Sequence, residues 1–202
     1  MPYENCMKKD HLPIIGVLGA LGLFALATTR YPGGYDWANN TISALFQPHA
    51  LNGAQNPARS IAVLAVFMFC VSVAVVFKWI SSSAKSRFHK KTIEISGIGS
   101  MVYAFLVVTP MHNVLVSVGL IFFLTAILTT LHMVYLEGRS GMFYAGIVCL
   151  ALPLTNAAMY YGNVLYGLLP IVQKLGMAMW VGWLIAVLLT GSKIGTQRLD
   201  PA

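Results

Sequence analysis

Long apolar segments with almost no charged residue dominate this chain and limit what it can fold into. An α-helix needs roughly 20 consecutive apolar residues to cross a bilayer, and segments of this kind recur along the sequence. Of all residues, 57% are hydrophobic and 9% are charged, whereas soluble domains carry about 25% charged residues. The segments lack the alternation of barrel strands, so they predict helices whose backbone groups are satisfied internally.

Six such segments predict one all-α integral membrane domain that occupies residues 1–202 and leaves no room for a separate soluble domain. The first segment follows a basic tail, as the apolar core of a signal peptide would. Gly16 and Ala20 have the spacing that suits close helix packing, which favours a retained transmembrane helix instead. The expected spans are 12–29, 60–80, 92–109, 112–135, 142–161 and 168–190.

Basic residues are divided unevenly between the two sides that six spans create. Ten Lys and Arg residues fall on the side of the termini and three on the other side, and the basic excess faces the cytoplasm. We therefore expect both termini in the cytoplasm, and the bacterial inner membrane or another plasma membrane as the location. The ten are Lys8, Lys9, Lys78, Lys85, Arg87, Lys90, Lys91, Arg139, Lys193 and Arg198, and the three are Arg30, Arg59 and Lys174.

Charge and cysteine content exclude several classes of function. The net charge of +7 comes from loops and span ends, without interleaved aromatic residues, so we expect membrane lipids and no nucleic acid as partners. Cys6, Cys70 and Cys149 lack the spacing of a disulfide framework or a zinc site.

The connection of residues 30–59 is too long for an ordinary turn, and it is rich in aromatic and large apolar residues. This content predicts a folded extracytoplasmic cap between the first two spans. We expect a short helix from Asn39 or Asn40 to Phe46, with Asn40 as its N-cap, and a second span capped by Asn56.

Polar residues accumulate at the outward ends of the spans, where the cap also lies. Polar groups at membrane depth are costly and usually face the bundle interior. We therefore predict one outer-face pocket that binds a lipid or lipid-linked molecule, with a cation on its phosphate and amide or phenol groups on the rest. The expected ligand-binding residues are Asn39, Asn40, Arg59, Asn113, Asn156, Tyr160 and Lys174.

Two catalytic arrangements are also compatible with these residue types. Ser43 as nucleophile, His112 as base and Asp36 as orienting group would form a hydrolytic site, although no G-x-S-x-G motif is present. His49 with His112 and Asp36 would suit zinc, but no H-x-x-x-H pair is present. We expect neither a metal nor a cofactor, and whether the protein is an enzyme stays open.

Six of the candidates also have a purely structural explanation. His112 would sit in the headgroup region after Pro110, Asp36 would close a turn, and Lys174 would extend to the headgroups. Asn39 and Asn40 would only cap a helix. Asn156 would bond a carbonyl that Pro153 leaves free.

Four short motifs resemble the DUF998 family of six-span membrane proteins. They are Tyr31-Pro-Gly-Gly-Tyr35, Asn40-Thr-Ile-Ser-Ala-Leu45, Asn56-Pro57 and Pro110-Met-His-Asn113. Gly34 is an insertion relative to the family's Pro-Gly-Tyr. The resemblance implies six helices with an outer-face motif after the first, and a looser likeness to the Frag1/DRAM group points towards lipids. The alternative function is a non-enzymatic membrane subunit or scaffold that packs against a partner protein or a second copy.

Overall fold

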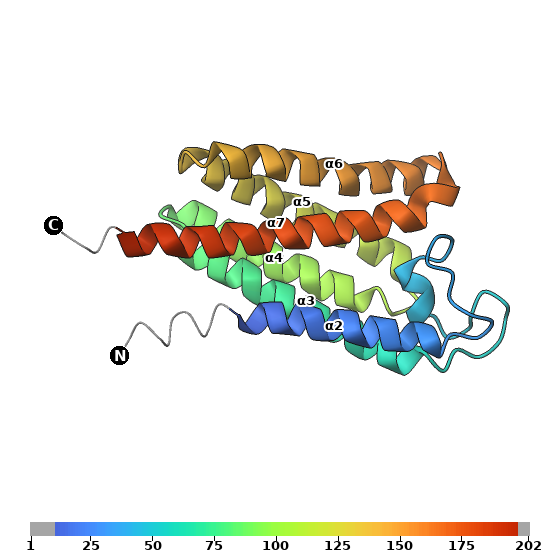
Figure 1. The fold of residues 1–202 in the computed structure, drawn as a ribbon. Coiled ribbons are helices and arrows are strands. Elements are labelled where there is room, and N and C mark those ends of the chain that lie inside the picture. The colour runs from blue at the N-terminus through green and yellow to red at the C-terminus, as the bar shows by residue number, and fades with distance from the viewer. Residues whose placement is uncertain (1–10, 198–202) are drawn as a thin grey trace.

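The computed structural model describes residues 11–197, with side chains to residue 191, and shows six long helices (Figure 1). The described chain contains no strand, which confirms the all-α prediction. The long helices are α2 (Leu12–Thr29), α3 (Arg59–Ser83), α4 (Arg87–Leu106), α5 (His112–Leu136), α6 (Ser140–Gly162) and α7 (Leu169–Gln197), and the short 3₁₀ helices are η1 (Ile42–Phe46) and η2 (Tyr166–Leu168).

Within the described residues, five helical segments are long and apolar enough to cross a membrane. They are α2, α3, α5, α6 and the segment Tyr166–Gly191 that joins η2 to α7. The helix left out is α4, which begins with the basic residues Arg87, Lys90 and Lys91. The chain is thus a multi-pass membrane bundle, and the crossing of α4 stays a prediction.

Most helices begin or end a few residues beyond the expected apolar spans. Helix α2 has the expected bounds, whereas α4 begins five residues before the predicted 92 and ends three before the predicted 109. Backbone hydrogen bonding continues through polar residues, and Lys and Arg stems lie along apolar surface while their charges reach water. Apolar content therefore locates a helix better than it locates its ends.

Small residues let neighbouring helices approach closely. A Cβ atom added at Gly16 would lie 2.1 Å from the Ser72 hydroxyl on α3, and one at Gly97 would lie 2.4 Å from the Phe77 ring. Close pairs form between α2 and α3, α3 and α4, α4 and α5, and α6 and α7. Among consecutive helices, α5 and α6 contact each other least, which leaves space between them.

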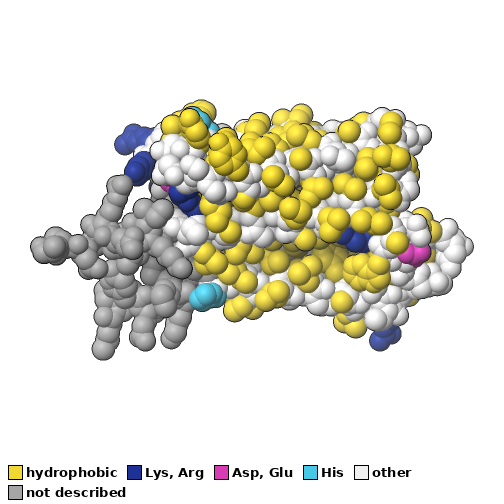
Figure 2. Space-filling model, turned by 45° about the horizontal axis from the view of Figure 1, so that its top comes forward, with side chains coloured by type: hydrophobic (Ala, Val, Ile, Leu, Met, Phe, Trp, Pro, Cys, Tyr) yellow, Lys and Arg dark blue, Asp and Glu magenta, His cyan; other side chains and the backbone are white. Residues whose placement is uncertain are grey.

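The start of α2 and the end of α7 lie at the same end of the bundle, together with the α3–α4 and α5–α6 turns (Figure 1). Of the ten basic residues predicted for the inner side, Lys8, Lys9, Arg198 and the Lys193 side chain lie outside the described part of the chain. On the face shown in Figure 2, hydrophobic side chains cover the middle of the bundle and Lys and Arg lie nearer its ends. The cytoplasmic orientation of this end stays a prediction.

The cap is folded, but its helix differs from the predicted one. Thr41, not Asn40, occupies the N-cap of η1, and its side chain makes no capping hydrogen bond to the helix backbone. The backbone carbonyl of Asn40 instead accepts a hydrogen bond from the Tyr35 hydroxyl at 2.9 Å, and burial raises the pKa of that hydroxyl. The 3₁₀ helix begins at Ile42, two or three residues later than the expected start at Asn39 or Asn40.

Asn56 has a different role from the predicted N-cap of the second span. The N-cap of α3 is Ala58, whose N–H donates to Oδ1 of Asn56 at 3.1 Å. The buried Asn56 side chain also donates to the carbonyls of Leu45 at 2.9 Å and Gln47 at 3.0 Å. Asn56 thus fastens η1 to the start of α3.

Candidate functional site

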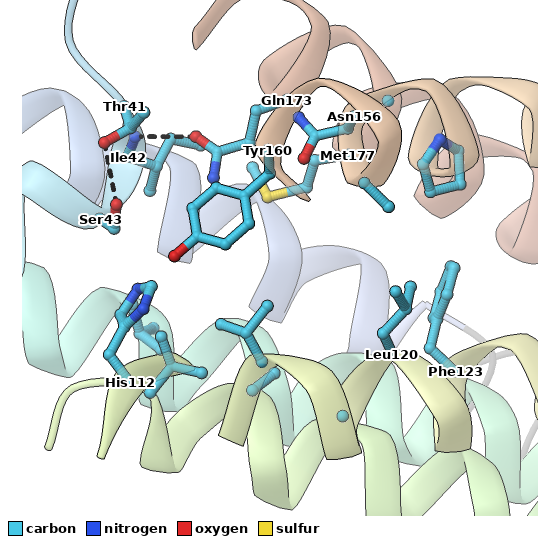
Figure 3. A pocket seen from close by; sticks show the side chains of 18 of the residues that line it. Thr41, Ile42, Ser43, His112, Leu120, Phe123, Asn156, Tyr160, Gln173 and Met177 are labelled. Carbon is cyan, nitrogen blue, oxygen red and sulfur yellow. Dashed lines mark hydrogen bonds between the residues drawn. The ribbon is translucent and has the colours of Figure 1, made fainter. Parts of the chain in front are cut away.

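A cavity of about 550 Å³ in the bundle is lined by residues of α3, α4, α5, α6 and α7 and by Phe24 of α2. Residues of η1 line one end of it (Figure 3). The sparse contact between α5 and α6 accounts for the opening. Most of the wall is apolar. Figure 3 shows Leu120 and Phe123 farther from η1 than His112, and the Trp180 ring packs against Phe123 and Phe69. The cavity volume is within the range of about 300–1,000 Å³ typical of small-molecule sites.

Polar side chains gather at the end of the cavity next to η1. Ser43 lies on η1, and Thr41 is the residue before that helix. Figure 3 shows His112 of α5 facing these two side chains, with the Tyr160 side chain of α6 between them and His112. Gln173 of α7 completes this end, and Asn156 of α6 lies deeper. The site therefore has a polar end and an apolar body.

Gln173 sets the position of η1 at this polar end. Its side-chain oxygen accepts a hydrogen bond from the Ile42 N–H at 3.1 Å, and one residue later the Ser43 hydroxyl bonds the Thr41 hydroxyl at 2.8 Å. Ser43 and His112 both line the cavity, yet their bonds in the structure are to other groups. Nδ1 of His112 contacts the side-chain oxygen of Asn113 at 3.2 Å.

Asn113 links α5 to α6 from outside the cavity. Its side-chain oxygen accepts a hydrogen bond from the Tyr160 hydroxyl at 2.8 Å, and the Ser117 and Tyr161 hydroxyls bond each other at 2.7 Å one turn away. Asn113 is absent from the lining, whereas Tyr160 belongs to it. Asn113 thus positions Tyr160.

Asn156 is the one predicted binding residue whose side chain needs a partner. Its Nδ2 is buried and makes no hydrogen bond in the structure. The structural explanation, in which this amide bonds a carbonyl freed at Pro153, is therefore not observed for its nitrogen. A buried donor without a partner costs about 1–3 kcal/mol. Because Asn156 lines the cavity, a ligand acceptor would relieve that cost.

Asp36 and Asn39 lie outside the cavity, on the exposed part of the cap. The carboxylate of Asp36 accepts hydrogen bonds from the Asn39 side chain at 2.7 Å and from the Ala38 N–H at 2.8 Å. The Asn39 amide, followed by the backbone N–H groups, holds the pKa of Asp36 below its ordinary value. The structure thus does not bring Asp36 together with Ser43 and His112.

Lys174 and Arg59 also lie outside the cavity lining. The ammonium group of Lys174 donates to the carbonyls of Trp37 at 2.9 Å, Asn40 at 2.6 Å and Pro170 at 3.1 Å. Nε of Arg59 donates to the Phe46 carbonyl at 3.3 Å. Both cations fasten the cap to the bundle.

In the part of the chain that the structure describes, no three His, Cys, Asp or Glu side chains are close enough to hold a metal ion. His49, one of the weighed zinc ligands, lies on the exposed cap and forms an isolated bridge with Gln55.

The sequence analysis did not include Thr41 and Gln173 among the ligand-binding residues, although both line the cavity. Gln173 precedes Lys174, and successive side chains of an α-helix point about 100° apart. As a result, Gln173 reaches the cavity while Lys174 binds the cap. The polar start of the last span was the available signal, but it does not separate these neighbours.

No protein-family model matches the chain, and neither a curated protein nor a solved structure gives a match. The resemblance to the DUF998 family therefore stays a prediction.

Proposed function

We propose that the protein binds a lipid or lipid-linked molecule in this cavity, with the ligand's polar end at η1 and its apolar part deeper in the bundle. The observation that carries the proposal is the division of one cavity into a polar end and an apolar body. Ser43, His112 and Tyr160 line the first, and Phe123 and Trp180 line the second. A lipid has the same division, and the surrounding bilayer supplies lipids.

The proposed orientation places all six helices across the membrane with both termini in the cytoplasm. In that orientation the cap and the polar end lie at the outer leaflet of a plasma membrane, such as the bacterial inner membrane. The basic residues at the inner end, including Lys85 and Arg139, support it through the positive-inside rule. Membership of the DUF998 family would agree with this layout.

Two neighbouring alanines of α6 provide the test. Ala157 lines the cavity, whereas Ala158 is exposed and absent from the lining. Ala157→Phe fills the space where the ligand would lie, and Ala158→Phe adds the same volume outside it. Lipid that co-purifies with the protein is measured by mass spectrometry. We expect Ala157→Phe to lose it and Ala158→Phe to keep it. Equal lipid content in both variants would contradict the proposal.

A second candidate function is hydrolysis of the bound molecule, because Ser43 and His112 line the same cavity. In that case ligand binding would bring the His112 ring within about 3 Å of the Ser43 hydroxyl. His112→Ala and Ser43→Ala would then each abolish turnover of a lipid ester while the protein stays folded. Turnover that survives His112→Ala would exclude this mechanism.

The alternative of a scaffold is favoured by the exposed face of α7. Gly182 on that face has open space where a Cβ would be added, and Ala178 is also exposed. Close packing against a partner protein or a second copy would use such residues. Gly182→Leu should then lower the assembled mass measured by light scattering, and an unchanged mass would count against a scaffold.

A further inference from the structure

Among the described residues, the cavity wall has no permanently charged side chain, and His112 is its one imidazole. Its described lining residues include no Lys, Arg, Asp or Glu. The remaining polar groups are hydroxyls and amides, such as those of Ser43, Tyr160, Asn156 and Gln173. The polar end, and the Asn156 amide deeper in the cavity, can thus offer hydrogen bonds but no permanent cation.

The two cations predicted to bind a phosphate, Lys174 and Arg59, donate to backbone carbonyls instead. A Lys ammonium group has three donors, and in Lys174 they meet the carbonyls of Trp37, Asn40 and Pro170. Lys174 would have to release the cap before it could bind a phosphate. Arg59 donates to the Phe46 carbonyl and lies outside the lining.

Two amides leave hydrogen-bond donors at the cavity. Nδ2 of Asn156 is buried without a partner. The side-chain oxygen of Gln173 is occupied by the Ile42 N–H, which directs the donor end of this amide away from that contact. Two amide NH2 groups in a wall without Lys or Arg suit acceptor oxygens on the ligand.

The energetic comparison separates two kinds of lipid. A phosphate that enters this end would lose its hydration without gaining a Lys or Arg partner, and burying an unpaired charge is far more costly than burying a hydrogen-bonded polar group. Ester and hydroxyl oxygens need only the hydrogen bonds that Asn156 and Gln173 can give. We infer that the ligand is an uncharged lipid whose polar end carries ester or hydroxyl oxygens, such as an acylglycerol. This inference rests on the proposed function and specifies its ligand class.

The test compares two lipids that differ only in the phosphate. Full-length protein in detergent is titrated with 1-monooleoylglycerol and with 1-oleoyl lysophosphatidate, and bound ligand is measured by equilibrium binding of the radiolabelled lipids. We expect monooleoylglycerol to bind at least about tenfold more tightly, equivalent to 1.4 kcal/mol.

A pair of α6 variants tests the role of the unpaired amide. Asn156→Leu removes the buried donor and should weaken monooleoylglycerol binding about fivefold, the effect of one hydrogen bond. Thr155→Leu makes the same kind of change at the exposed neighbouring position, outside the lining, and should leave the affinity unchanged.

The outcomes distinguish this inference from the function on which it rests. If lysophosphatidate binds as tightly as monooleoylglycerol or more tightly, the ligand class is wrong but lipid binding stands. If neither lipid binds, the ligand class is also wrong, and the lipid content of the Ala157→Phe protein then decides whether the cavity holds another lipid. If Asn156→Leu fails to fold, the relative affinity of the wild-type protein for monooleoylglycerol and lysophosphatidate still tests the ligand class.

Discussion

The ammonium nitrogen of Lys174 lies 2.6 Å from the backbone carbonyl oxygen of Asn40, and this contact joins the last helix to the cap. The same ammonium group lies 5.7 Å from the centre of the Tyr35 ring, whose hydroxyl also donates to Asn40. The Lys174 ammonium group and the Tyr35 hydroxyl thus both donate to the Asn40 carbonyl, two residues before η1. The cap that lines the cavity depends on them.

Lys174→Met should loosen the cap while the helices stay assembled. It leaves the carbonyls of Trp37 and Asn40 without their shared donor, and hydrogen bonds to a charged group contribute about 1.5–3 kcal/mol each. We expect faster amide hydrogen exchange in residues 36–46, measured by mass spectrometry. Lys78→Met removes a cation that pairs with Glu94 at the opposite end, so it should leave exchange in the cap unchanged. Equal effects of the two variants would contradict the assignment.

Acid should release the turn that Asp36 closes. The Asn39 side chain, and then the N–H groups of Ala38 and Asn39, lower the pKa of this carboxyl below its ordinary 3.8. The carboxylate therefore stabilises the folded turn at pH values above 3.8, and this contribution disappears as the pH falls through the lower, folded pKa. Fluorescence of the adjacent Trp37 should change in that range in the wild type. Asp36→Asn should lack the transition, and the same transition in both proteins would assign it to another group.

Two glycine substitutions should have opposite effects on stability. A Cβ at Gly97 would lie 2.4 Å from Phe77, which is fully buried. Gly97→Ala should therefore cost about 1–3 kcal/mol through overpacking. At Gly182 a Cβ meets nothing within 4 Å, so Gly182→Ala should stabilise α7 by about 0.5–1 kcal/mol. Thermal unfolding in detergent measures both shifts. A Gly97→Ala protein as stable as the wild type would show that α3 and α4 do not pack as described.

The buried guanidinium of Arg139 should hold the end of α7 against the α5–α6 turn. It donates to the Val187 carbonyl at 3.2 Å, bonds the Thr190 hydroxyl and pairs with Glu137 at 3.2 Å. Arg139→Leu should lower stability by about 2 kcal/mol because these groups lose a charged partner. Arg87 is exposed, so Arg87→Leu should leave the midpoint of thermal unfolding within about 1–2 °C of the wild type. A similar loss in both variants would assign the effect to charge alone.

Apolar segments predicted the helices well because a bilayer-length helix needs little beyond its own composition. The bounds of α2 agree with the expected 12–29, and α5 with 112–135 to within one residue. The start of α4 differs from the expected residue 92, because the helix includes Arg87, Lys90 and Lys91 although these residues are not apolar. The cap helix also began later than expected, since Lys174 and Tyr35 bind the Asn40 carbonyl.

The candidate site was only partly predictable. Ser43, His112, Asn156 and Tyr160 line one cavity, and all four belong to the polar residues that the sequence analysis grouped on one side of the membrane. The same reasoning grouped Asp36 with them, although Asp36 bonds only its own turn. A pattern along the chain assigns a residue to one side of the membrane, but the direction of its side chain depends on contacts with other elements.

By itself, the sequence determined that this protein is a helical membrane bundle with a cap after its first helix, because both properties follow from local composition. Only the tertiary structure decided that α5 and α6 separate around a cavity and that Gln173 lines it. It also decided that Lys174 binds the cap. Those outcomes depend on how residues far apart in the chain pack, and packing over that distance leaves no periodic signal in the sequence.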